Sequence, residues 1–369
     1  MDLVKRSSLY DYFILPCFAL PLLGFFWPAY ILAGLHSLFK VHWNDIIQEK
    51  VLFISLVSFC IIKFLQDSSL ATILFFKTFV GLYFFIFYFS YINKKSFEKI
   101  LIALMTSYII GEFFYRLYIQ KYIFGRYFWR LAYPRPLGFG ENASITTAIL
   151  VVFLLFFSRS LIKKWIILLV TTIIISGSGV GYFGLIYYYF SSKWKCIKKN
   201  PKSAGIGLCI VLSLYSAFYI LMGDNISTSN FLYKISPFYI IFLIKIKYLL
   251  LLNHVDLNLL KWDEILFGIR WSNSHYSGSD CGWYEVFLMS GVVGVIINFF
   301  LIINYFKDKR ISIFILISLF HYSVIWWPAG QIFLGFIAGL NKRSKESEDH
   351  DHIAFSNTEA SSSVVLNGI

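Results

Sequence analysis

The sequence predicts an all-α polytopic integral membrane protein, and three observations carry that prediction. Of the 369 residues, 58% are hydrophobic and 20% aromatic, while only 14% are charged. A soluble domain of this length cannot bury that much apolar surface, so membrane lipid must surround most of the chain. The apolar residues also fall in long runs, and Lys and Arg gather between the runs.

Ten apolar runs precede a polar tail, and each is judged against the about 20 residues that a helix needs to cross a bilayer. They are 10–39, 51–65, 71–92, 97–119, 142–158, 165–176, 179–191, 204–222, 282–304 and 311–340. We expect the first run to be a hairpin broken near Pro21 to Pro28. The last should be a hairpin broken at 327–330, where proline disrupts the helix. Together they predict one helical domain over 1–340 with about 10–12 membrane spans.

Residues 341–369 form a polar tail with many Ser, Glu and Asp residues, which we expect to be disordered and cytoplasmic. Its His350 and His352 could bind a metal, but the pair is more typical of a solvated tail. The five cysteines of the chain are scattered without the spacing of metal ligands or of a disulfide framework. We therefore expect no metal site and no cofactor.

Basic clusters set the predicted orientation, because Lys and Arg concentrate in cytoplasmic loops. The clusters lie at 94–99, 159–164, 193–202, 307–310 and 342–345. Placing them in the cytoplasm puts both termini there as well and leaves 120–141 and 223–281 as two larger outward loops. Topology thus accounts for the formal net charge of +13, and we do not expect nucleic-acid binding.

The first outward loop, 120–141, carries Arg126, Arg130 and Arg135 against a single acid, Glu141. Basic residues on the outer side run against the positive-inside rule, and an anionic ligand would account for them. Arginine offers a planar, permanently charged fork that matches a phosphate. Arg135 is the strongest candidate, because prolines beside it stiffen the backbone and glycines after it permit close approach of a ligand. The alternative is that these arginines snorkel as interfacial anchors beside Tyr and Trp.

The second outward loop, 223–281, is long, and loops of such length are usually functional. It contains Arg270, His275 and Asp280 near its end, and Glu285 follows just inside the next apolar run. A histidine near carboxylates can act as a general base, because its pKa lies close to working pH. The alternatives are a solvated loop histidine at His275 and, at Glu285, a first-turn acid favoured by the helix dipole.

Two charges lie inside the run 97–119, where Glu112 and Arg116 are one helical turn apart. Charges within a membrane are costly, so such residues are candidates for function. The structural alternative is an i,i+4 ion pair in which each side chain neutralises the other, and we favour it.

Three segments carry a resemblance to a known family. They are RPLGFGENASITTAIL from Arg135, IIISGSGVGYFGLIYYYF from Ile173 and DCGWYEVFLMSGVVGVIINFF from Asp280. With the long outward loop before the last spans, they resemble the Wzy-type O-antigen or capsular repeat-unit polymerases over nearly the whole chain. The resemblance implies a glycosyltransferase of the bacterial inner membrane. Its active site would face the periplasm, with both termini in the cytoplasm.

The resemblance also implies a substrate and residue roles. The growing chain would pass from one undecaprenyl-diphosphate-linked oligosaccharide to the sugar end of a fresh repeat unit, without a metal. The residues assigned to the diphosphate are Arg135, Arg270, Arg126 and Arg130. His275 is assigned as the base that takes the acceptor proton, and Asp280 as its orienter or an alternative base. A chain-length regulator and a flippase are implied as partners.

Two other functions share parts of this pattern. An O-antigen ligase moves the same donor onto lipid A core, but we expect ligases to have a Thr-x-Ser-Arg-type motif where this chain has Ser-Gly-Ser-Gly from Ser176. A flippase should line the midplane of its spans with polar residues, whereas here they gather in the outward loops. A purely structural subunit would not require the outward basic surplus. The sequence therefore favours a polymerase.

Overall fold

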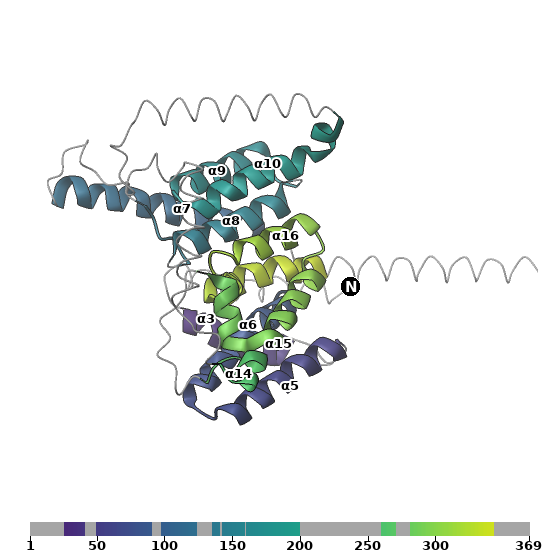
Figure 1. Ribbon diagram of the computed structural model, residues 1–369. Coiled ribbons are helices and arrows are strands. Elements are labelled where there is room, and N and C mark those ends of the chain that lie inside the picture. The colour runs from purple at the N-terminus through teal and green to yellow at the C-terminus, as the bar shows by residue number, and fades with distance from the viewer. Residues whose placement is uncertain are drawn as a thin grey trace, which may run out of the picture.

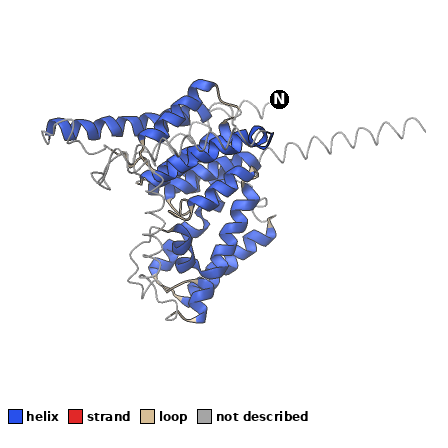
Figure 2. Cartoon of the chain, turned by 45° about the horizontal axis from the view of Figure 1, so that its top comes forward, coloured by secondary structure: helices blue, strands red, loops and turns tan. Residues whose placement is uncertain are grey.

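The computed structural model describes residues 26–40, 49–90, 97–123, 135–140, 142–158, 160–199, 260–270 and 281–342 (Figure 1). All regular secondary structure in these ranges is helical, as Figure 2 shows. The predicted all-α class is therefore confirmed for this part of the chain.

The helices follow the predicted apolar runs closely. They are α3 (Phe26–Lys40), α5 (Lys50–Gln66), α6 (Leu70–Ser90), α7 (Phe97–Tyr118), the π-helical turn η1 (Ile119–Ile123), α8 (Ala143–Phe157), α9 (Lys163–Ile175), α10 (Gly179–Lys199), α14 (Trp262–Phe267), α15 (Gly282–Tyr305), α16 (Lys309–Ser318) and a last helix over 328–342. The run 204–222 and the outward loop up to residue 259 lie outside the described residues. The same holds for most of the tail.

The last predicted run, 311–340, departs from the prediction at its break. α16 ends at Ser318, residues 319–327 form an irregular connection, and the last helix begins at Pro328. Proline lacks an N–H and has a fixed φ, so it fits the first position of a helix, where the N–H has no intrahelical acceptor. The run is thus interrupted as predicted, but the break lies at 319–327 and not at 327–330, because Pro328 starts the second helix.

Three described helices are long and apolar enough to cross a membrane: α6, residues Lys99–Tyr118 of α7, and α15. α8 is also apolar but has only 15 residues. These helices are compatible with a membrane protein. The number of spans and their orientation stay predictions.

Two groups of packed helices can be distinguished within the described bundle. α7, α8, α9 and α10 pack together in the upper part of Figure 1, and α5, α14 and α15 pack together in its lower part. α16 joins the groups, since it contacts α8 and α10 as well as α15.

Several helices meet at one end of this bundle, around the connection 319–327. Trp283, at the start of α15, donates its backbone N–H to the Leu319 carbonyl at 2.8 Å. Ser144, at the start of α8, places its Oγ 3.2 Å from His321 Nε2. We call this end the loop end, because both segments that bear the candidate arginines lead into α8 and α15 here.

The opposite end is rich in cations. Glu49, just before α5, accepts hydrogen bonds from Tyr305 at the end of α15 and from Lys342 at the end of the last helix. Tyr187 of α10 donates to the carbonyl of Arg310, at the start of α16, at 3.0 Å. The cations of this end, which we call the basic end, include Lys50, Lys99, Lys163, Lys164, Lys307, Lys309, Arg310 and Lys342.

An aromatic row links α14 to the connection 319–327. Phe59 of α5 stacks on Phe79 of α6, with 4.4 Å between ring centroids, and Phe267 lies 6.4 Å from Phe59. Phe79 meets Trp326 edge-on at 6.4 Å. These large rings supply much of the buried apolar surface near the loop end, and they hold its parts in fixed positions.

Candidate functional site

The segment that carries Arg270 is docked into a break in α15. Helical geometry fails at Gly291 (φ 62°, ψ −170°), and the Leu288 carbonyl accepts the backbone N–H of Ile269 at 2.7 Å. Gly268 (φ 84°) and Gly291 lie so close to the facing backbone that a Cβ at either position would overlap it. Only glycine satisfies both this conformation and this approach, so the pair fixes how the segment sits on α15.

Two side chains of α5 hold the same segment from another side. Lys63 is fully buried and donates to the carbonyls of Gly268 at 2.9 Å and Ile269 at 2.7 Å. Gln66 donates to the Gly268 carbonyl at 3.1 Å and to Asp263 Oδ2 at 3.2 Å. A buried ammonium is costly unless it is hydrogen-bonded, and here two of its acceptors are the backbone carbonyls just before Arg270, the third being Gln66 Oε1 at 2.9 Å.

Arg270 projects from this anchor as a partly exposed side chain. Its Nη2 donates to Asp263 Oδ2 at 3.1 Å, and 39% of the side chain is exposed. The pKa of Asp263 lies below its usual value, because Gln66 and Arg270 both donate hydrogen bonds to the carboxylate. Arg270 Nε is buried and has no hydrogen-bond partner within the described ranges. An unpaired buried donor costs about 1–3 kcal/mol, which an added acceptor would relieve.

The Arg135 loop is anchored by Glu112 of α7. The Glu112 carboxylate accepts the backbone N–H groups of Leu137 at 3.0 Å and Gly138 at 2.8 Å. It also accepts Arg116 Nε at 2.8 Å, so the predicted i,i+4 ion pair is confirmed. The pair has a further role that we did not predict, since the same carboxylate binds the arginine loop to α7.

Thr146, in the first turn of α8, closes the Arg135 loop. Its hydroxyl donates to the Leu137 carbonyl at 2.8 Å and accepts the Gly140 N–H at 3.0 Å. Gly138 (φ 72°) lies against the Thr146 side chain, where a Cβ would overlap it. The glycines therefore serve the packing of the loop on α8. Like Arg270 Nε, Arg135 Nε is buried without a hydrogen-bond partner in the described part of the chain.

A buried polar cluster joins the connection 319–327 to α8. His321 Nε2 lies 3.2 Å from Ser144 Oγ, and Ser178 Oγ donates to Ser144 Oγ at 3.3 Å. Both serines are buried. Sequence reasoning missed this cluster, because its three members come from three separate turns and no local pattern links them.

A cavity of about 470 Å³ lies beside the same connection, between α6, the first turns of α15 and residues 323–328. Glu285 lies in its wall and accepts a hydrogen bond from Ser323. The first-turn position of Glu285, which suits the helix dipole, is confirmed. Its carboxylate also lines the cavity, together with Lys77 and Trp327.

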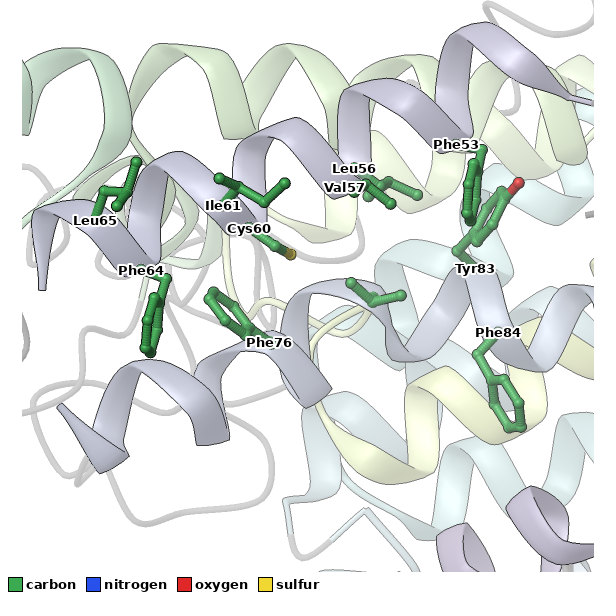
Figure 3. A pocket seen from close by; sticks show the side chains of 11 residues that line it. Phe53, Leu56, Val57, Cys60, Ile61, Phe64, Leu65, Phe76, Tyr83 and Phe84 are labelled. Carbon is green, nitrogen blue, oxygen red and sulfur yellow. The ribbon is translucent and has the colours of Figure 1, made fainter. Parts of the chain in front are cut away.

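An apolar groove of about 420 Å³ runs between α5 and α6 (Figure 3). Its lining extends from Phe53 to Leu65 along α5 and from Phe76 to Phe84 along α6. The groove ends beside Gln66, which holds the arginine segment at the loop end. An apolar groove with a polar cluster at one end can bind an amphipathic ligand.

The structure describes two of the six side chains predicted for the site, Arg135 and Arg270, and holds each by a separate set of contacts. The other four lie outside the described residues: Arg126, Arg130, His275 and Asp280. Sequence reasoning missed Lys63, although a charge within an apolar run is the same signal that singled out Glu112.

Within the described ranges, no group of three or more His, Cys, Asp or Glu side chains is placed to hold a metal ion. No protein-family model, curated protein or solved structure matches this chain. A function must therefore be argued from the chemistry of the site itself.

Proposed function

We propose that this chain is a membrane glycosyltransferase that acts on glycans carried by a polyprenyl diphosphate. Within that class, we propose a repeat-unit polymerase, which transfers the growing chain from undecaprenyl diphosphate onto a new lipid-linked repeat unit. The observation that carries the proposal is the pair of arginines at the loop end, Arg135 and Arg270. Arg135 precedes a backbone stretch that Glu112 anchors, and Arg270 follows a stretch that Lys63 anchors. Each arginine keeps a buried Nε–H without a partner in the described ranges.

A diphosphate supplies what these arginines lack. Phosphate oxygens accept charge-assisted hydrogen bonds from guanidinium N–H groups, often two in parallel. The anchors at Glu112 and Lys63 fix the backbone beside each arginine, so less freedom is lost when the side chains close on an anion. Preorganised cations also stabilise the charge that develops on a departing diphosphate. We therefore propose that arginines, rather than a metal, stabilise the leaving group.

The apolar groove supports a lipid-linked substrate. Its α5 wall from Phe53 to Leu65 is about 18 Å long at the rise of an α-helix, and it leads to the end of α5 where Lys63 and Gln66 hold the arginine segment. Part of a polyprenyl tail laid in this groove would bring its diphosphate to the loop end. Burial of the tail adds affinity without demanding polar contacts along the groove.

The proposed reaction moves one glycosyl bond. The oxygen of an acceptor hydroxyl attacks the anomeric carbon of the donor sugar, and the bond from that carbon to the diphosphate oxygen breaks. Its electron pair leaves with the diphosphate beside the arginines. The acceptor proton passes to a base, for which His275, oriented by Asp280, stays the prediction.

The distribution of charge supports an orientation in the membrane. Cations gather at the basic end, and cytoplasmic loops carry the excess of Lys and Arg. We propose that the basic end and both termini face the cytoplasm and that the loop end faces the periplasm of a bacterial inner membrane. The donor and acceptor glycans would then meet on the periplasmic side.

The test is the lipopolysaccharide banding pattern of a strain that lacks the gene, with and without the gene restored. A core-plus-one-repeat band that becomes a ladder on complementation supports a polymerase. Core without any repeat contradicts it: accumulated lipid-linked polymer would then indicate a ligase, and its absence a flippase. Arg135→Ala and Arg270→Ala, at normal membrane levels, should leave the single-repeat band. Lys164→Ala, an exposed cation of the basic end, should restore the ladder.

A further inference from the structure

The cavity beside Glu285 carries chemistry that the proposed diphosphate site does not use. Polar groups of three kinds lie in its wall: a carboxylate, an ammonium and the hydroxyls of Ser323 and Thr78. The Glu285 carboxylate accepts hydrogen bonds, the Lys77 ammonium donates them, and the Ser323 hydroxyl does both. Ser323 donates to Glu285 and is the one side-chain partner of that carboxylate within the described ranges. The carboxylate therefore has capacity for a further donor.

Aromatic rings form the apolar part of the wall. Trp326 is held by a hydrogen bond from its Nε1 to Asn298 Oδ1 at 3.3 Å and by an edge-on contact with Phe75, at 5.6 Å between centroids. Trp327 is half-buried, and Pro328 beside it starts the last helix. Rings fixed in this way offer a flat surface that loses little freedom when a ligand packs on it.

We infer that this cavity binds a sugar ring of the lipid-linked glycan. A sugar hydroxyl is both a donor and an acceptor, so it pairs with a carboxylate, an ammonium and a hydroxyl alike. A lipid tail would offer no donor to the remaining capacity of the Glu285 carboxylate and would bury that charge in an apolar contact, which is costly. The C–H face of the ring packs on the indoles. Glu285 and Lys77 bind and orient the sugar, and the inference rests on the proposed function, which supplies the glycan.

The position of the cavity fits the order of groups in the substrate. Trp326 of the cavity wall contacts Phe79, which stacks on Phe59, and Phe59 contacts Phe267 just before the Arg270 segment. Met289, which also lines the cavity, has its backbone against Gly268, so the cavity and the anchored Arg270 segment are neighbours at the loop end. A glycan diphosphate has the same order, with its sugars next to the phosphates.

A kinetic experiment tests the role of the wall. The full-length protein in nanodiscs is given undecaprenyl-diphosphate-linked repeat units, and polymer formation is followed for Glu285→Ala and Trp327→Ala. Glu285→Ala should raise KM about tenfold, the size of one lost hydrogen bond to a charged group. Trp327→Ala should raise KM by about the same factor through lost ring packing, and kcat should change much less in both variants. Phe320→Ala is the matched control, because this ring lies on the same connection but is exposed. Unchanged KM in both cavity variants would overturn the inference.

A labelling experiment reads occupancy without relying on turnover by a variant. Ala71, which lines the cavity, is changed to cysteine in a protein whose native cysteines are replaced by serine, and its reaction with N-ethylmaleimide is timed. Lipid-linked repeat units should slow labelling severalfold, and undecaprenyl diphosphate alone should not.

Three results of this labelling experiment would count against the inference. Equal labelling rates with and without the glycan, in a protein that makes polymer, overturn the inference and leave the proposed function standing. Protection by undecaprenyl diphosphate alone means that the cavity holds lipid, and overturns it as well. A wild-type protein that makes no polymer overturns the proposed function and this inference together.

Discussion

The two arginine-bearing segments are held at the same end of the bundle by anchors of opposite charge. An acid, Glu112, accepts two backbone N–H groups beside Arg135, whereas a base, Lys63, donates to two backbone carbonyls beside Arg270. Each anchored stretch contains a glycine with positive φ. The charge of each anchor thus matches the backbone groups that face its helix: a carboxylate accepts N–H groups, and an ammonium donates to carbonyls. Beside both anchors, an arginine Nε is buried and unpaired within the described ranges.

The two anchors differ in burial. Lys63 is fully buried, while 16% of the Glu112 side chain is exposed and Arg116 shares its charge. Hydrogen bonds to an ion strengthen as water is excluded. A backbone group that loses such a bond is then costly to leave unpaired, because no water can replace the lost partner. The Arg270 segment should therefore depend on its anchors more strongly than the Arg135 loop does.

Gly291→Ala should be the most damaging change to the Arg270 side of the comparison. A φ of 62° costs a non-glycine residue on the order of 1–3 kcal/mol, and the new Cβ would also overlap the backbone of Leu266. We expect little folded protein on size-exclusion chromatography. Gly111→Ala is the matched control, since its Cβ would meet nothing within 4 Å. Equal yields and thermal midpoints for both variants would contradict the docking at the α15 break.

Lys63→Met keeps the length of the side chain and removes its donors. The Gly268 carbonyl keeps its hydrogen bond from Gln66, but the Ile269 carbonyl loses the ammonium, and a buried acceptor left unpaired costs about 1–3 kcal/mol. We expect a clear fall in the free energy of unfolding in detergent and loss of polymerase activity. Lys164→Met, at an exposed position, should do neither. Full stability of the Lys63 variant would mean that the ammonium does not hold the segment.

Glu112→Ala should destabilise the protein less, because its carboxylate is partly exposed. The effect should be local, with faster hydrogen exchange at the amides of Leu137 and Gly138, which mass spectrometry can follow. Arg116→Ala should leave those amides nearly as protected, since the carboxylate keeps its backbone bonds. Unchanged hydrogen exchange in Glu112→Ala would mean that the Glu112 carboxylate does not anchor the Arg135 loop as Lys63 anchors the Arg270 segment.

The smallest effect on stability is expected from Asp263→Asn, which removes the ion pair between Asp263 and Arg270. Both side chains are well exposed, so solvent screens their attraction. Because the pKa of folded Asp263 is lowered by Gln66 and Arg270, the pair contributes stability above the ordinary Asp pKa of about 3.9. That contribution is lost as pH falls through the lowered value. The gap in thermal midpoint between wild type and Asp263→Asn should thus hold from pH 7 to about pH 4 and shrink below it. A gap that is the same at all pH values would rule out this ionisation.

Local patterns predicted the helices, the Glu112–Arg116 pair and the Arg135 loop, because each depends on residues close together in the sequence. The contacts of Lys63 could not be predicted, since Gly268 lies 205 positions away and only tertiary packing joins them. The break at Gly291 was hidden by an apolar run that continues through it. The start of the last helix was misjudged because proline disrupts a helix interior but suits a first turn.

The central claim is that the two anchored arginines bind a lipid diphosphate, and binding of undecaprenyl diphosphate to the purified full-length protein tests it most directly. Native mass spectrometry would compare wild type, Arg135→Ala, Arg270→Ala and Lys164→Ala. We predict that each loop-end variant binds about tenfold more weakly, while the basic-end control binds like wild type. Binding of wild-type strength in both arginine variants would contradict the account.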